Sequence, residues 1–246
     1  MSNPRFYTPE QLTDGMITAL PSNAAVHASR ALRLVAGDHA TLFNGDGNDY
    51  LCEFISVTKS AVTAKIISKT AVTAESPLNI TLLQAISSGD RMDYTIQKAV
   101  ELGVNNIQPI NSQRGVVKLA GERAEKRKEH WQNVVIAACE QSGRAIIPKI
   151  NNANTLANWL SNNPLLASDM RLTLAPTAIA ALTNLPAPSG IIYLLIGAEG
   201  GLTNDEIELA SSQGFTPILL GKRILRTETA ALAAIAAMQI IWGDFK

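Results

Sequence analysis

IGAEGGL at residues 196–202 and LGKRILRTET at residues 220–229 are two glycine turns, and they decide the fold of this chain. The first turn follows an apolar run over residues 191–195, and the second leads into an alanine-rich stretch. Each pattern predicts a strand that ends, turns through glycine and continues into a helix. In parallel α/β sheets such turns bring backbone N–H groups and helix amino ends to the carboxyl edge, where ligands bind. The sequence therefore predicts a small-molecule pocket built mostly from main chain.

Outward from these turns, strand and helix patterns alternate from residue 78 onward. Strands are predicted over residues 79–86, 107–110, 147–150, 171–175, 191–196 and 216–220, and helices over 122–142, 155–160 and 203–212. A helix that ends at Gly103 and a final alanine-rich helix complete the pattern. Thr203 and Glu206 have capping-box spacing, which starts a helix directly after the first turn. This alternation is typical of an α/β fold with a parallel sheet covered on both faces.

The first seventy or so residues are instead rich in strand patterns. Residues 40–43 and 50–55 flank NGDGN at 44–48, whose residues tolerate positive φ and predict a hairpin. A further strand is expected over 61–67 and a short helix over 27–34. Short strands with tight turns predict a small barrel. Because residues 68–77 are small, polar and end in proline, we expect one domain over 1–72 and a second over 73–246.

Charge and cysteine content limit the function classes. The formal net charge is zero, which argues against a polycation that coats nucleic acid. Residues 111–149 nevertheless carry eight Lys or Arg against four Glu, a local balance of +4. This segment either steers an anionic partner or is an ordinary solvated helix face. The two cysteines lack a nearby partner, which fits a reducing cytoplasm.

Neither a metal nor a membrane is expected as a partner. His27, His39 and His130 are spread along the chain without the spacing of metal ligands. The amino terminus has no apolar signal core. The longest apolar stretch, residues 230–242, is too short and alanine-rich to span a bilayer.

Beyond these physical arguments, nearly the whole chain resembles the SPOUT methyltransferases, and within them the RsmE family of 16S ribosomal RNA uridine-N3 methyltransferases. The residues that carry the resemblance are 5–7, 27–34, 42–47, 97–104, 113–114, 138–144 and the two glycine turns. The resemblance implies a C-terminal SPOUT-type α/β knot with a trefoil threading, and an N-terminal PUA-like β-barrel that docks RNA. Since knots are rare among folds, that threading depends entirely on the resemblance.

The resemblance also implies S-adenosylmethionine as the cofactor, held by main-chain groups of the two turns and a third wall. The cofactor-binding residues would then be Leu174, Ala175, Pro176, Ile196, Gly197, Glu199, Gly200, Gly201, Leu220, Gly221, Ile224, Leu225 and Arg226. Where the family usually has proline, this chain has Ala198, which should loosen the turn by roughly 0.4–1 kcal/mol. The family's homodimer packs knots together, and the small side chains of the final helix favour a subunit contact over a purely buried helix.

The implied reaction is methylation of N3 of a uridine in the decoding region of 16S ribosomal RNA, on the small ribosomal subunit. Removal of the imide proton needs a nearby cation and a proton acceptor. The candidate cations are Arg226 and Arg114, and Glu199 or Glu228 would accept the proton or orient the site. Both glutamates could equally cap helices or pair with arginines. The expected RNA contacts are Arg5, Arg30, Arg33, Arg114, Glu140, Gln141 and Arg144.

Two other functions fit the same turns. A ribose 2′-O-methyltransferase of the knotted class would share the cofactor site, although not usually this N-terminal barrel. A ribosome assembly factor without catalytic activity would keep the fold alone. Nucleotide hydrolysis is excluded because the chain has no G-x-x-x-x-G-K-[ST] motif.

Overall fold

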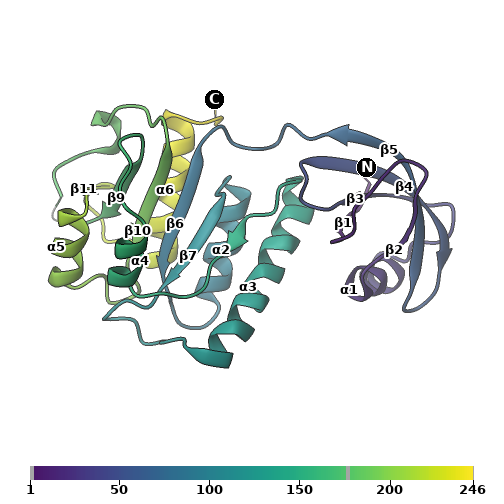
Figure 1. The fold of residues 1–246 in the computed structure, drawn as a ribbon, viewed down its shortest axis with the longest axis horizontal. Helices are drawn as coiled ribbons and strands as arrows, with labels where there is room; N and C mark the ends of the chain where they lie inside the picture. The colour runs from purple at the N-terminus through teal and green to yellow at the C-terminus, as the bar shows by residue number, and fades with distance from the viewer. Residues whose placement is uncertain (1–2, 176–177, 246) are drawn as a thin grey trace. The chain divides into compact units, whose positions relative to one another are not determined.

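The structure is a computed structural model that describes residues 3–175 and 178–245 (Figure 1). Its contacts divide the chain into two compact units. The first consists of Met1–Glu75 and Cys139–Ile147, and the second of Ser76–Ala138 and Pro148–Lys246. The first unit ends close to the boundary predicted at residue 72. It also includes residues 139–147, which the sequence analysis had assigned to the second domain.

A five-stranded sheet forms the first unit, in the order β1-β3-β4-β5-β2. Its strands are β1 (Arg5–Tyr7), β2 (Ile17–Ala19), β3 (His39–Phe43), β4 (Asn48–Val57) and β5 (Val62–Ala71). The predicted hairpin is confirmed, since β3 and β4 pair antiparallel around a turn in which Gly45 and Gly47 have positive φ. Within the described residues the ladder stays open between β1 and β2. The buried side chains of Phe6, Leu42 and Phe54 belong to its core.

A helical segment begins earlier in this unit than the sequence predicts. Helix α1 (Ser22–Val26) follows Pro21 and continues into a π-helical turn, η1 (His27–Ala31). Arg33 has φ +55°, a left-handed conformation that cannot continue a right-handed helix. The predicted range of 27–34 therefore missed the first turn and extended past the end.

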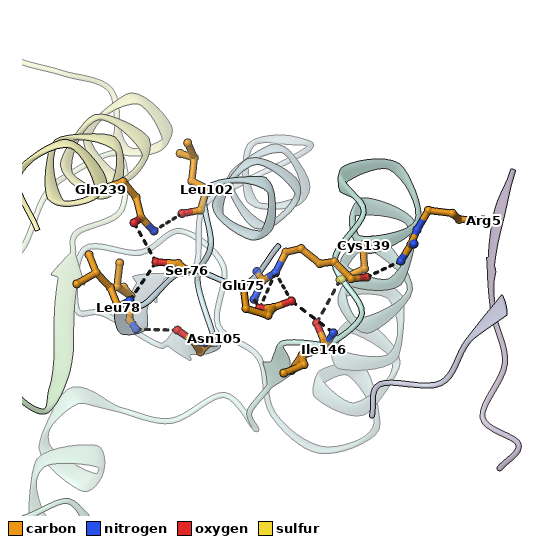
Figure 2. A network of polar contacts seen from close by, with 11 residues as sticks. Arg5, Glu75, Ser76, Leu78, Leu102, Asn105, Cys139, Ile146 and Gln239 are labelled. Carbon is orange, nitrogen blue, oxygen red and sulfur yellow. Dashed lines mark hydrogen bonds and ion pairs between the residues drawn. The ribbon is translucent and has the colours of Figure 1, made fainter. Parts of the chain in front are cut away.

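Residues 139–147 are fixed to the first unit by buried polar contacts (Figure 2). The Arg144 side chain is 3% exposed and its Nη2 lies 2.6 Å from Oε2 of Glu75. Arg5 donates from Nη2 to the Arg144 carbonyl at 3.1 Å, and the Tyr7 amide donates to Oε1 of Glu140 at 3.0 Å. These contacts join β1 and the segment before β6 to a stretch more than sixty residues further along the chain.

The second unit contains a six-stranded, all-parallel sheet in the order β11-β9-β10-β6-β7-β8. Its strands are β6 (Asn79–Ala85), β7 (Asn106–Ile110), β8 (Lys149–Ile150), β9 (Met170–Leu174), β10 (Ile191–Ile196) and β11 (Phe215–Ile218). Its helices are α2 (Arg91–Glu101), α3 (Gly121–Ser142, from Cys139 onward part of the first unit), α4 (Leu156–Asn162), η2 (Leu182–Asn184), α5 (Asn204–Ser212) and α6 (Thr227–Ile241). The predicted parallel α/β sheet is confirmed. The trefoil threading stays a prediction.

Helices cover this sheet in pairs. Helix α2 packs against α6, and α4 packs against α5. Leu83 of β6 and Leu195 of β10 lie in one apolar cluster with Trp159 of α4 and Ala210 of α5. Strand β6 is buried along nearly its whole length, as expected for a central strand of a parallel sheet. None of the described helices is long and apolar enough to cross a bilayer.

Gln239, the polar residue within the last apolar stretch, holds three parts of this unit together. It is fully buried, accepts a hydrogen bond from Ser76 at 2.9 Å and donates to the Leu102 carbonyl at 2.8 Å (Figure 2). Gly103 ends α2 with φ +89°, and a Cβ there would approach Nε2 of Gln239 to 2.7 Å. The predicted helix stop at Gly103 is therefore confirmed, and the close approach of Gln239 is a second reason for glycine.

Replacing Glu75 by alanine should strongly destabilise the first unit. It takes the carboxylate away from the buried guanidinium of Arg144, and we expect the free energy of unfolding to fall by about 3 kcal/mol. Urea unfolding measures the loss. The control is Glu122→Ala, which breaks an ion pair with Lys126 whose two side chains are 82% and 74% exposed. That variant should lose less than about 1 kcal/mol, and equal losses would contradict a structural role for Glu75.

Candidate functional site

The carboxyl edge of the parallel sheet carries the predicted site. Parallel pairing places the loops after β6, β7, β9, β10 and β11 at this one edge. Both glycine turns are among them, and β9, the neighbour of β10 and β11, ends at Leu174 with Ala175 directly after it. Backbone bonds from Ala175 N–H to the Ile218 carbonyl and from Leu219 N–H to the Ala180 carbonyl join the β9 and β11 loops. Pro176 lies outside the described residues.

The first turn folds back on itself within five residues. The Gly201 amide donates to the Ala198 carbonyl at 2.9 Å, and Gly201 has φ +69°. At Gly197 a Cβ would lie 2.8 Å from the carbonyl carbon of Gly201 and from the amide nitrogen of Leu202. Two of the three glycines are therefore required by backbone geometry, Gly201 by its φ and Gly197 by space. The capping box of Thr203 and Glu206, as predicted, starts α5 directly after the turn.

Glu199, at the tip of this turn, binds the amino end of α2. Its Oε1 accepts hydrogen bonds from the Ser88 amide at 2.9 Å, the Ser88 hydroxyl at 2.8 Å and Nη1 of Arg91 at 2.8 Å. Partial burial raises the pKa of this carboxyl, but the hydrogen bonds outweigh it and lower the pKa to about 2. Glu199 is therefore an ionised anchor at neutral pH and a weak proton acceptor.

Arg114, from the loop after β7, contacts the same turn from another side. Its Nη1 donates to the carbonyls of Gly200 at 3.1 Å and Leu202 at 3.2 Å. Buried Glu206 accepts from the Gln113 amide at 2.8 Å and so ties this loop to the start of α5. The guanidinium of Arg114 thus supports main-chain carbonyls of the turn.

The second turn presents its polar groups at the start of α6. Gly221 has φ +85°, and Ile224, expected to bind the cofactor, is 90% exposed. Arg226 is the N-cap of α6, and its exposed side chain makes no hydrogen bond to any described residue. Glu228, in the first turn of the helix, has a buried Oε2 without a hydrogen-bond partner in the described part of the chain. Leu220 and Leu225 are half-buried.

The expected RNA contacts separate into two groups. Arg30, Arg33 and Gln141 are exposed on the first unit, whereas Arg5 and Arg144 are engaged in ion pairs with Asp49 and Glu75. Arg5 also lies over the Phe43 ring at 4.8 Å. Glu140 is half-buried, and burial raises its pKa although the Tyr7 amide, His27 and Arg5 oppose the shift. The structure does not support Arg144 as an RNA contact, since its guanidinium is covered.

Sequence reasoning missed three residues at the turns, namely Gln84, Ser88 and Arg91. Ser88 and Arg91 bind Glu199, and Gln84 and Thr227 bind each other at 2.9 Å, with Thr227 donating to the Gly197 carbonyl at 2.6 Å. A glutamine within the otherwise apolar stretch over residues 82–86 was the available signal for Gln84. Ser88 and Arg91 gave no such signal because exposed polar residues at a helix start are ordinary.

Comparison with known proteins relates nearly the whole chain to RNA methyltransferases. A family model described as an RNA methyltransferase domain matches residues 74–239, and one described as an RNA methyltransferase PUA domain matches residues 20–67. Ribosomal RNA small subunit methyltransferase E of Buchnera aphidicola is 36% identical over 241 residues, which cover 98% of this chain and 97% of that protein. The chain belongs to the ribosomal RNA small subunit methyltransferase E family. The Bacillus subtilis member is 29% identical and aligns over 96% of both chains.

A solved structure of this family has the same fold. The methyltransferase E of Neisseria gonorrhoeae, crystallised with S-adenosylmethionine, superposes with a TM-score of 0.92 at 44% identity, over 99% of this chain and 100% of that one. The expected SPOUT α/β fold with an N-terminal PUA domain is therefore confirmed. No cluster of three or more metal-ligating side chains occurs among residues 3–175 and 178–245.

Glu199→Gln should alter how stability depends on pH. The pKa of Glu199 is lowered to about 2, against about 4.3 in an unfolded chain. Ionised Glu199 therefore adds stability above about pH 5, and that contribution is lost as the pH falls toward 2. We expect the melting temperature of the native chain to fall more steeply between these pH values than that of Glu199→Gln. Parallel melting curves would show that the carboxylate is not anchored.

Proposed function

We propose that this chain transfers the methyl group of S-adenosylmethionine to N3 of a uridine in the decoding region of 16S ribosomal RNA. The observation that carries the proposal is the closed Gly197–Gly201 turn at the carboxyl edge of the sheet, in a family with a cofactor-bound relative. The substrate is the assembled small subunit, and the protein acts in the cytoplasm. The family resemblance and the exposed arginines of the first unit support the choice of N3 and of a decoding-region uridine as the substrate.

The residues at this edge fit the chemistry of S-adenosylmethionine. Four buried polar atoms near the turns have no hydrogen-bond partner among the described residues: Gln84 Oε1, Ser87 Oγ, Ser112 Oγ and Glu228 Oε2. A buried polar atom without a partner costs about 1–3 kcal/mol, so such atoms at a predicted site favour a polar ligand. The cofactor residues proposed are Leu174, Ala175, Pro176, Ile196, Gly197, Glu199, Gly200, Gly201, Leu220, Gly221, Ile224, Leu225 and Arg226.

The side chains of Arg226 and Glu228, at the start of α6, are free of hydrogen bonds to other described residues and can therefore contact a substrate. S-adenosylmethionine, when bound, supplies an electrophilic methyl group, and the uracil imide must lose its N3 proton. If the imide pKa is about two units above the ambient pH, ionisation costs roughly 2.7 kcal/mol. Arg226 supplies the cation beside the uracil oxygens, and Glu228 accepts the proton. Glu199 and Arg114 support the turn instead, because their polar groups are already bound there.

RNA binding is assigned to the exposed side chains of the first unit. Arg30 and Arg33 flank the end of η1, and the φ of +55° at Arg33 turns the chain sharply there. Phosphate contacts by these arginines give an affinity that falls with salt. Gln141 is exposed on the segment that the Arg144–Glu75 pair holds in place. The protein works as a homodimer, and exposed Ile240 and Ile241 at the end of α6 favour a contact there.

Mass mapping of 16S RNA tests the reaction. Small subunits from cells without this protein should lack one methyl group, and purified protein with S-adenosylmethionine should restore it as N3-methyluridine. Gly197→Ala is the matched inactive control, because the added Cβ would lie 2.8 Å from backbone atoms. A methyl group on a ribose 2′ oxygen would instead establish the 2′-O-methyltransferase. If no methyl group were transferred, an assembly role would remain and the proposal would be rejected.

Glu228→Gln tests the assignment of the proton acceptor. The amide keeps the size of the side chain but cannot take the N3 proton, so kcat should fall by roughly 100-fold or more. Single-turnover methylation measures kcat, and calorimetry should show unchanged S-adenosylmethionine binding. Glu208→Gln, at an exposed position of α5, is the control and should keep full activity. Full activity of Glu228→Gln would exclude Glu228 as the acceptor.

A further inference from the structure

Buried hydrogen bonds join the two glycine turns to each other and to β6. Nε2 of Gln84 donates to Oγ1 of Thr227 at 2.9 Å, and Oγ1 of Thr227 lies 2.6 Å from the Gly197 carbonyl. Gln84 is 0% exposed and Thr227 6% exposed. These hydrogen bonds therefore link a central strand, the first residue of α6 and the first residue of the Gly197–Gly201 turn.

The chemistry of these groups fixes the direction of every bond. Nε2 of Gln84 also donates to the Ala85 carbonyl at 3.0 Å, so the amide nitrogen, and not its oxygen, must face these partners. An amide nitrogen only donates, so Oγ1 of Thr227 accepts from it. The single hydroxyl proton of Thr227 is then directed to the Gly197 carbonyl. Because the Thr227 hydroxyl accepts one hydrogen bond and donates another, it holds Gln84 and the Gly197 carbonyl at fixed distances from α6.

Burial of this glutamine is difficult to explain by packing alone. β6 is otherwise apolar toward its carboxyl end, and a buried amide is unfavourable unless it is fully hydrogen-bonded. Gln84 nevertheless keeps Oε1 without a partner among the described residues. An apolar residue would stabilise the strand better. We therefore attribute the glutamine to a role at the candidate site rather than to the packing of the strand.

We propose that Gln84 and Thr227 are positioning residues that set the spacing between the two turns of the cofactor site. Thr227 lies between Arg226 and Glu228, so the same bonds fix where these two side chains leave α6 relative to the Gly197–Gly201 turn. The inference depends on the proposed function, because it assigns a role within the S-adenosylmethionine site. Without the Gln84–Thr227 and Thr227–Gly197 hydrogen bonds the two turns can separate, and the cofactor then binds less tightly. RNA binding is unaffected.

Thr227→Val removes the hydroxyl and keeps the shape of the side chain. We expect calorimetry on the full chain to show about tenfold weaker binding of S-adenosylmethionine and of its demethylated product, S-adenosylhomocysteine. The KM for the cofactor should rise similarly, and the KM for RNA should not change. Thr227→Ser, which restores the hydroxyl, should recover most of the affinity. Affinity of Thr227→Val equal to that of the native chain would overturn the inference.

Two further variants separate positioning from folding. Thr95→Val removes a buried hydroxyl that donates to the Arg91 carbonyl at 2.8 Å within α2, and it should leave cofactor binding unchanged. Gln84→Met keeps the volume but removes both the Nε2 that donates to Thr227 and the unpartnered amide oxygen. Without ligand, its melting temperature should be at least that of the native chain, yet it should bind the cofactor more weakly. Equal loss in Thr95→Val, or native affinity in Gln84→Met, would overturn the positioning role.

The outcome also distinguishes this inference from the proposed function. If the native chain binds neither S-adenosylmethionine nor S-adenosylhomocysteine, the methyltransferase proposal itself is rejected. If the native chain binds S-adenosylmethionine and methylates RNA, and Thr227→Val and Gln84→Met do so equally well, only the positioning role is rejected. The double variant Thr227→Val with Gln84→Met should bind no more weakly than Thr227→Val alone, because the two residues act as one unit.

Discussion

The turn between β10 and α5 is held by three neighbouring segments, and the candidate site depends on that constraint. The Thr227 hydroxyl holds its first carbonyl, Ser88 and Arg91 hold its Glu199 tip, and Arg114 holds two later carbonyls. Within it, the Gly201 amide closes on Ala198. A short glycine-rich loop is flexible by itself, so the neighbours must supply the rigidity that a main-chain binding site requires.

The same contacts explain how the polar side chains are divided between support and chemistry. Glu199 has several donors and a pKa lowered to about 2, which suits an anchor. Arg226 and the buried Oε2 of Glu228 lack hydrogen-bond partners in the described residues. A group that reacts must be free to bind a substrate, whereas a group already satisfied by the protein stabilises the ground state.

Much of the second unit could be predicted because its signals are local. The order of strands and helices, the capping box at Thr203 and Glu206 and the helix stop at Gly103 all depend on neighbouring residues. Long-range polar contacts gave no such signal. Arg144 was expected on the surface with RNA, and it is instead buried against Glu75, sixty-nine positions earlier in the sequence. The sequence around a charged residue looks the same whether its side chain faces solvent or pairs with a carboxylate from a distant segment.

The amino-acid sequence by itself determined the parallel α/β class, the two glycine turns and, through family resemblance, the cofactor expected there. Glycine, capping residues and apolar periodicity act over a few residues, so their consequences are visible in the sequence. Only the tertiary structure decided which polar groups at the sheet edge are already bonded. It brings Ser88, Arg91 and Thr227 to one turn and places Gln84 against Thr227. Hydrogen bonds between distant segments depend on distances of about 3 Å, and only the folded chain sets those distances.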